Sequence, residues 1–177
     1  MSVPLEAVIF DLDDTLHDDT ATYHGAASRV AHEVARESGI VAQRLLDAYI
    51  AQAERFWSTL DTPTLSVNLV DLRTTMWRAA LVETGLDDSA LAVRCADAYN
   101  THRRDLLELW PGALDLLQRL RADGYKLALI TNGFSETHRE KLTILQLDDA
   151  FDEVFIADEV GMIKPDPRLF RLAAERL

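Results

Sequence analysis

Cysteine, basic residues and long apolar runs are all scarce in this sequence, and each scarcity excludes a class of protein. The single cysteine, Cys95, cannot form a disulfide bond within the chain, which is typical of a reducing compartment. Lys and Arg number 18 against 30 Asp and Glu, and the resulting net charge of −12 disfavours binding to nucleic acid or anionic lipid. No apolar stretch is long enough to cross a membrane, and the N-terminus lacks the pattern of a secretory signal. We therefore expect a cytoplasmic protein with no nucleic-acid or membrane partner.

The first strong structural signal is the short apolar run from Ala7 to Phe10. Three aspartates, Asp11, Asp13 and Asp14, follow it directly. An unbroken apolar run predicts a strand buried on both faces, as in a parallel sheet covered by helices. The carboxyl end of such a strand is where open α/β sheets bind their ligands. A polar turn leading into a helix would explain the aspartates equally well, so the rest of the chain decides between the two interpretations.

After Leu16 the spacing of apolar residues becomes helical. Gly39, Pro63 and Gly85 interrupt the pattern and separate its segments. Four amphipathic helices joined by short connections predict an antiparallel four-helix bundle. The predicted helices span residues 20–38, 41–60, 68–83 and 89–107.

Strands and helices alternate again after Trp110, which predicts a parallel sheet with right-handed crossovers. We therefore expect an α/β core formed by residues 1–17 and 110–177, interrupted after its first strand by an all-helical domain, residues 18–109. An insertion at this point would cover the aspartates like a lid. The core is predicted to contain helices at 113–122, 135–147 and 168–177, and strands at 126–131 and 153–157.

Polar residues follow each of the predicted strands. Thr131, Asn132 and Gly133 come directly after the second strand, and Lys164 lies in the loop after the third. Taken alone, Asn-Gly is typical of a turn and Lys-Pro of an exposed loop. The carboxyl ends of parallel strands meet at one edge of a sheet. Because polar residues follow each predicted strand in turn, the sequence favours a shared site at that edge.

These three segments resemble the motifs of the haloacid dehalogenase-like hydrolase superfamily, in its phosphatase branch with a helical cap. The first motif matches Phe10–Leu16, the second Ile130–Gly133, and the third Val160–Gly161 with Lys164–Pro167. The resemblance spans almost the whole chain. It implies a Rossmann-like core with a four-helix cap, and a Mg²⁺-dependent phosphatase that hydrolyses a small phosphorylated metabolite.

The resemblance also implies a role for each motif residue. Asp11 would attack phosphorus as the nucleophile, and Asp13 would act as general acid and then as general base. Mg²⁺ would be bound by the Asp11 carboxylate and the Asp13 carbonyl, since it prefers oxygen ligands. Lys164 would neutralise charge on the nucleophile and the phosphoryl group. Thr15 would position Asp13 by a hydrogen bond, and the phosphoryl oxygens would be held by Thr131, Asn132 and the main chain near Gly133.

The family's fourth motif, an acidic pair after a further strand, is not found before Leu177. Neither Asp158 nor Asp166 is placed to replace it. From the sequence alone we expect a truncated and impaired form of a longer protein, with a weakened metal site. The first strand would then lie at an uncovered sheet edge, through which we expect self-association.

Three alternative functions remain open at this point. A haloacid dehalogenase is the nearest one, although an acid at Asp13 has no use in that reaction. A phospho-accepting signalling domain is disfavoured by the long insertion after the first strand, and a non-catalytic, partner-binding remnant would explain the missing motif. The substrate would be selected by helical-domain residues, with candidates at His17, His24, Trp57, Arg73 and Trp77.

Overall fold

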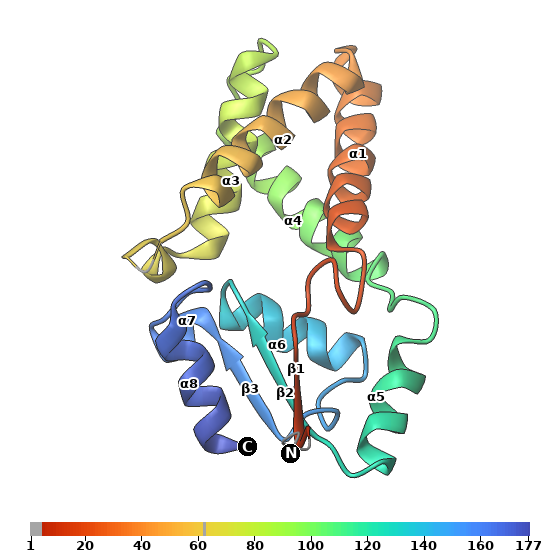
Figure 1. Cartoon of the computed structure of the whole chain (residues 1–177). Coiled ribbons are helices and arrows are strands. Elements are labelled where there is room, and N and C mark those ends of the chain that lie inside the picture. Colours follow the sequence, from red (N-terminus) through yellow and green to blue (C-terminus); the bar gives the residue numbers. More distant parts are fainter. Residues whose placement is uncertain (1–4, 62) are drawn as a thin grey trace. The chain divides into compact units, whose positions relative to one another are not determined.

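The computed structural model describes residues 5–61 and 63–177 and divides into two compact units. The first contains the chain up to Asp19 together with Asp61–Ser66 and Leu107–Leu177. The second consists of Thr20–Leu60 and Val67–Leu106. Both units are coloured along the sequence in Figure 1. The domain boundaries expected from the sequence, at residues 17 and 110, stay a prediction.

The first unit is built on a three-stranded parallel sheet, which confirms the predicted fold class. The strands are β1 (Ala7–Phe10), β2 (Lys126–Thr131) and β3 (Glu153–Ile156), in the order β1-β2-β3. All three strands run in the same direction, so their carboxyl ends lie at one edge of the sheet (Figure 1).

Successive residues of β2 face opposite sides of the sheet, and each side has its own apolar core. Leu127 and Leu129 pack in a cluster with residues of α5 (Ala113–Ala122) and α6 (Ser135–Ile144). Ala128 and Ile130 pack with Leu169 and Ala173 of α8 (Pro167–Arg176). The sheet is therefore covered on both faces, as the unbroken apolar runs predict.

The strand β1 lies at the end of the described sheet and is less well covered than β2. Its Ile9 pairs in register with Ala128 but remains 38% exposed, whereas Ala128 is fully buried. The expected self-association through this edge stays a prediction.

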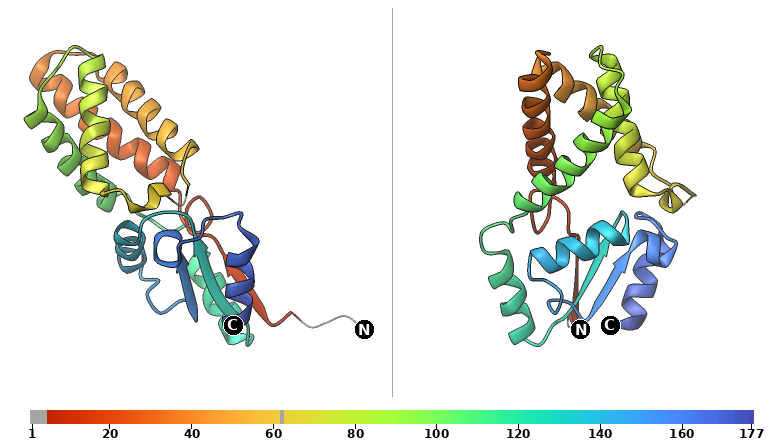
Figure 2. Two further views of the ribbon diagram at one scale, coloured as in Figure 1. Left: turned by 90° about the vertical axis from the view of Figure 1, so that its left-hand side faces the viewer. Right: turned by 180° about the vertical axis from the view of Figure 1, so that it is seen from behind.

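Four long helices form the second unit, as the spacing of apolar residues predicts, and they can be followed in Figure 2. Asn68 and Asp88 cap two of them, each side chain accepting a hydrogen bond from a main-chain N–H of the first turn. The core contains Tyr49 stacked on Trp77, with ring centroids 4.0 Å apart. The helices are α1 (Asp19–Ser38), α2 (Ala42–Ser58), α3 (Leu69–Glu83) and α4 (Ser89–Asp105).

Two local predictions were wrong. The helix expected over residues 135–147 ends at Ile144, because Gln146 adopts φ +58° and leaves the helical region. The loop expected after the third strand begins with a short helix, α7 (Ala157–Val160), and a 3₁₀ turn, Pro63–Ser66, follows α2.

Among the described residues, no helix has the length and apolar character needed to span a membrane.

Candidate active site

A tight turn follows β1 and places Asp11 and Asp13 in different surroundings. The side chains of Leu12 and Leu16 are buried, and Leu16 donates a main-chain hydrogen bond to the carbonyl of Leu12 at 2.9 Å. Asp14 adopts φ +56°, a conformation that Asp tolerates better than most residues. With the two leucines anchored in the core, Asp11 and Asp13 are held next to the carboxyl end of the sheet.

Asp11 is partly exposed and has one oxygen available. Its Oδ1 accepts a hydrogen bond from the main-chain N–H of Leu12 at 2.8 Å and pairs with the Lys164 ammonium at 2.6 Å. Its Oδ2 has no hydrogen-bond or ion-pair partner within the described part of the chain. A carboxylate fixed through one oxygen, with the other accessible, is suited to attack an electrophile or bind a cation.

Lys164 is held in place by Asn132. The Asn132 amide group accepts a hydrogen bond from the Lys164 main-chain N–H at 2.7 Å and donates one to its carbonyl at 3.1 Å. The resemblance implies that Asn132 contacts phosphoryl oxygens. In the structure its side chain instead joins the end of β2 to the Lys164 loop, and so positions the cation beside Asp11.

The hydroxyl group of Thr131 is buried and lacks a hydrogen-bond partner among the described residues. A buried hydroxyl group without a hydrogen bond destabilises the fold unless a ligand or a water molecule supplies the missing partner. Thr131 ends β2 and precedes the N-terminus of α6, where main-chain N–H groups favour an anion. Asp158 fastens this helix end, since its Oδ2 accepts hydrogen bonds from the Ser135 N–H at 2.7 Å and hydroxyl at 2.9 Å.

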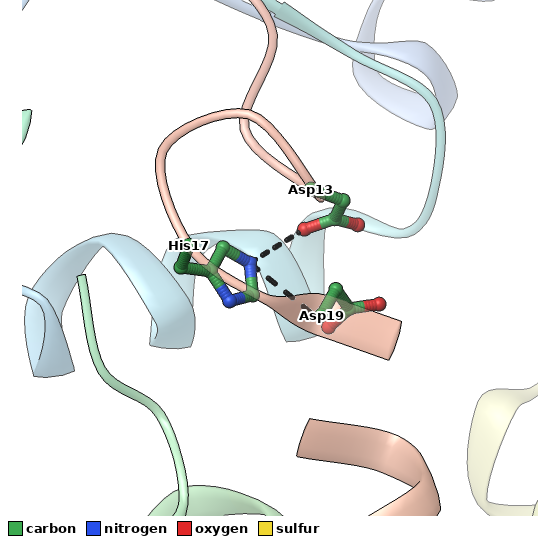
Figure 3. Close-up of side chains that lie close together, drawn as sticks. All are labelled: Asp13, His17 and Asp19. Carbon is green, nitrogen blue, oxygen red and sulfur yellow. Dashed lines mark hydrogen bonds and ion pairs between the residues drawn. The ribbon is translucent and has the colours of Figure 1, made fainter. Parts of the chain in front are cut away.

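Asp13 lies in a network of buried donors. Its Oδ1 is 2.5 Å from the Lys141 ammonium. The same oxygen is 2.9 Å from Nε2 of His17, a contact that Figure 3 shows. Its Oδ2 is 3.2 Å from Nε2 of His138. Lys141 also pairs with Asp19 at 2.9 Å, and all three donor side chains are almost fully buried. Both oxygens of Asp13 are therefore held by groups that the sequence analysis did not assign to it.

The expected hydrogen bond from Thr15 to Asp13 is not formed. Thr15 is exposed, and its side chain has no hydrogen bond to Asp13 within the described residues. The turn directs Thr15 outward, while His17, His138 and Lys141 supply the donors. His17, considered above as a substrate-selecting residue, is fully buried against Asp13 instead.

The surroundings of Asp13 favour its ionised form. Burial acts most strongly and by itself would raise the pKa of the carboxyl group. The positive charge of Lys141 and the hydrogen bonds from His138 and His17 together outweigh burial, so the pKa of Asp13 lies well below its ordinary value. Asp13 is thus an ionised carboxylate at neutral pH.

The ring of His138 lies between two hydrogen-bond acceptors. Its Nδ1 is 2.9 Å from the carbonyl oxygen of Phe134, and its Nε2 faces the Asp13 carboxylate. A carbonyl and a carboxylate both accept hydrogen bonds, so a neutral ring can satisfy only one of them.

Two oxygen-rich sets of residues are candidates for a metal ion. Asp13, His17 and Asp19 have ligand atoms within 4.8 Å of one another (Figure 3). The Lys141 ammonium already pairs with both carboxylates, so their negative charge is neutralised by a side chain of the protein rather than by a metal ion. Oδ2 of Asp11, which has no partner within the described residues, is the better candidate, because Mg²⁺ prefers hard oxygen ligands and retains several waters.

A protein-family model for haloacid dehalogenase-like hydrolases matches residues 5–177. The chain belongs to this family. The hydrolase is 31% identical to a phosphoserine phosphatase from Thermus thermophilus, over 96% of this chain and 74% of the relative. It is 32% identical to (S)-2-haloacid dehalogenase 1 from a Pseudomonas species, over 98% of this chain and 71% of the relative.

The fold of the hydrolase is also found among solved structures. The magnesium-bound HAD-hydrolase YfnB from Bacillus subtilis superposes with a TM-score of 0.69, covering 98% of this chain and 72% of that one. The sequence identity is 23%, and the similarity is one of fold.

Sequence reasoning missed His138 and Lys141 of the hydrolase. Both lie in the predicted helix 135–147, where Lys141 resembles an ordinary basic residue near a helix end. In the structure both residues share the buried face of α6 with Thr137 and Leu142. Spacings of one, three and four positions place polar side chains on the apolar face of the helix.

Proposed function

We propose that this hydrolase is a Mg²⁺-dependent phosphatase that acts on the phosphoric monoester of a small metabolite through an aspartyl-phosphate at Asp11. The observation that carries the proposal is the pairing of Asp11 with Lys164 at 2.6 Å, which leaves the second carboxylate oxygen accessible. Relatives named as phosphoserine phosphatase and glyceraldehyde 3-phosphate phosphatase support the reaction class.

In the first step, Oδ2 of Asp11 attacks phosphorus while the bond from phosphorus to the ester oxygen breaks. The Lys164 ammonium stabilises negative charge on the nucleophile and on the phosphoryl group. The unpartnered Thr131 hydroxyl is suited to donate to a phosphoryl oxygen, which would satisfy its hydrogen-bonding capacity. For this step Asp13 has to carry a proton, which it donates to the leaving alkoxide; Nε2 of His138, 3.2 Å from Asp13, is the adjacent group from which the proton can come.

In the second step, Asp13 accepts a proton from a water molecule whose oxygen attacks phosphorus. The bond from phosphorus to Asp11 breaks, phosphate is released, and the Asp11 carboxylate is restored. The low pKa of Asp13 ensures that it is ionised before this step, although it also limits how strongly it can accept the proton.

Mg²⁺ would be held by the carboxylate of Asp11 and the main-chain carbonyl of Asp13. When bound, it supplies positive charge that reduces repulsion between a carboxylate nucleophile and an anionic phosphate. We further propose that the helical unit serves as a cap that selects the substrate.

The test is hydrolysis of a panel of phosphomonoesters by the purified protein, with Mg²⁺ and with a chelator. We expect Mg²⁺-dependent phosphate release, and a loss on the order of 10⁴-fold or more in Asp11→Asn because the nucleophile is removed. The same samples are incubated with a 2-haloacid and assayed for halide, since a dehalogenase is among the relatives. Halide release without phosphatase activity, or full phosphatase activity in Asp11→Asn, would overturn the proposal.

A further inference from the structure

We infer that Lys141 is a positioning residue for Asp13, which it orients as the acid and base of the reaction and anchors to Asp19 at the start of α1. The inference rests on the function proposed above, because it concerns the leaving-group proton. It assigns a role to a side chain outside the three sequence motifs.

Lys141 forms ion pairs with two segments, the turn after β1 and the start of α1. The side chain is 1% exposed, and its ammonium lies 2.5 Å from Asp13 and 2.9 Å from Asp19. A buried ammonium is costly unless carboxylates compensate it at close range. Within the described residues these two carboxylates are its partners, so the lysine and both aspartates restrict one another's positions.

Neighbouring groups reinforce the same orientation of Asp13. His17 binds the oxygen that Lys141 binds, and His138 holds the other oxygen. Close approach of His138 depends on Gly133, since a Cβ at that position would lie 2.1 Å from Cε1 of the His138 ring. The carboxylate of Asp13 is therefore oriented from three sides by residues of α6 and of the turn before α1.

Orientation matters most where a proton has to be transferred. A misplacement of about 1 Å can reduce a rate by about 10²-fold. Among the described residues, no hydrogen bond or ion pair joins Lys141 to Asp11, so the loss of Lys141 should affect the leaving-group proton more than nucleophilic attack. An alkyl phosphate needs this proton because its alkoxide is a poor leaving group, whereas an aryl phosphate with a stable phenolate hardly needs it.

The experiment compares kcat for an alkyl and an aryl phosphate in the wild type, Lys141→Met and Lys141→Arg. Lys141→Met keeps an unbranched side chain as far as Cε but removes the charged ammonium group, and we expect its alkyl kcat to fall about 10²-fold with a much smaller aryl effect. Lys141→Arg should recover part of the alkyl activity, because its guanidinium can pair with both carboxylates. Asp13→Asn gives the largest expected difference between the losses of kcat on the alkyl and the aryl phosphate, with which the Lys141 variants are compared.

Arg139→Met is the matched control. Arg139 lies on the same helix but pairs with the exposed side of α7, through Glu159 at 2.7 Å. Its loss removes the same charge from α6 without touching Asp13, so both substrates should retain wild-type kcat. If Lys141→Met does not fold, Asp19→Asn releases the lysine on one side while leaving it paired with Asp13. In Asp19→Asn, kcat should fall less than in Lys141→Met, and again more for the alkyl than for the aryl phosphate.

A crystal structure of Lys141→Met, or of Asp19→Asn, separates this inference from the proposed function. In Lys141→Met we expect the Asp13 carboxylate to leave its wild-type position; in Asp19→Asn, where Lys141 still pairs with it, we expect a smaller displacement. An unmoved carboxylate, or equal losses on the alkyl and aryl substrates, would overturn the positioning role even if the protein is a phosphatase. A wild type that hydrolyses neither ester would instead refute the proposed function, and the structural comparison would still decide the positioning of Asp13.

Discussion

The ammonium group of Lys141 lies 2.5 Å from Oδ1 of Asp13, although the two residues are 128 positions apart in the chain. This contact joins α6 to the turn after β1 and gives a buried lysine a partner. It also gives Asp13 surroundings unlike those of Asp11, which is more exposed and pairs with Lys164. Two carboxylates two positions apart thereby acquire different properties, as different roles in one reaction require.

Replacing Gly133 with alanine should disturb the site through His138. Gly133 has φ +151°, and an added Cβ would clash with the His138 ring. We expect the free energy of unfolding to fall by about 1–3 kcal/mol from backbone strain alone. Urea unfolding measures this loss, and phosphatase activity should fall with it. Unchanged stability and activity would show that His138 is not confined as described.

Thr131→Val should separate stability from activity. The buried hydroxyl has no partner in the described residues, so an apolar replacement of the same shape should leave the unfolding free energy unchanged or raise it. A hydrogen bond to a charged phosphoryl group is worth about 1.5–3 kcal/mol, so kcat/KM should fall by about 10-fold or more. A destabilised variant with normal kcat/KM would contradict a role in phosphate binding.

The Asp13 carboxylate should make stability depend on acid pH. Because its pKa in the folded state lies below the ordinary value of 3.8, its contribution to stability is complete above that value and is lost as the pH falls further. Asp13→Asn should therefore be less stable than the wild type at pH 7, and the difference should shrink in acid. Urea unfolding across this range tests it, with the exposed Asp149→Asn as control. A difference that is constant with pH would refute the assigned pKa direction.

Cys95 should be unreactive in the folded protein. Burial of the thiol raises its pKa to about 12, so it stays protonated at neutral pH and is shielded from reagents. We expect very slow alkylation of the native protein and rapid alkylation in concentrated urea. Equal rates in the two conditions would show that the helical unit opens readily around α4.

The fold could be predicted because its signals are local. The apolar runs that become β1 and β2 are bounded by polar residues, and the four long helices repeat apolar side chains at helical spacing. The short helix α7 was missed because four residues are too few for a periodic pattern. The end of α6 was misplaced because a positive φ at Gln146 has no strong signature in the sequence.

The site was predictable only where strand ends define it. Asp11 and Lys164 were expected to meet because each follows a parallel strand, and their ion pair confirms that contact. Lys141 and His138 lie within a helix, so their contact with Asp13 depends on how α6 packs on the sheet. The partners of Asp13 and of Asn132 are likewise set by tertiary packing rather than by neighbours in the sequence.

The central claim, that Asp11 forms a covalent phosphoryl intermediate, is tested most directly by trapping it. The reaction of Asp13→Asn with a radiolabelled aryl phosphate is quenched in acid, and the labelled peptide is identified by mass spectrometry. Without Asp13 as base the second step is slowed, while a phenolate still leaves, so label should accumulate on Asp11 in a burst no larger than the amount of enzyme. Label on another residue, or the same burst after Asp11 is also replaced by Asn, would contradict the account.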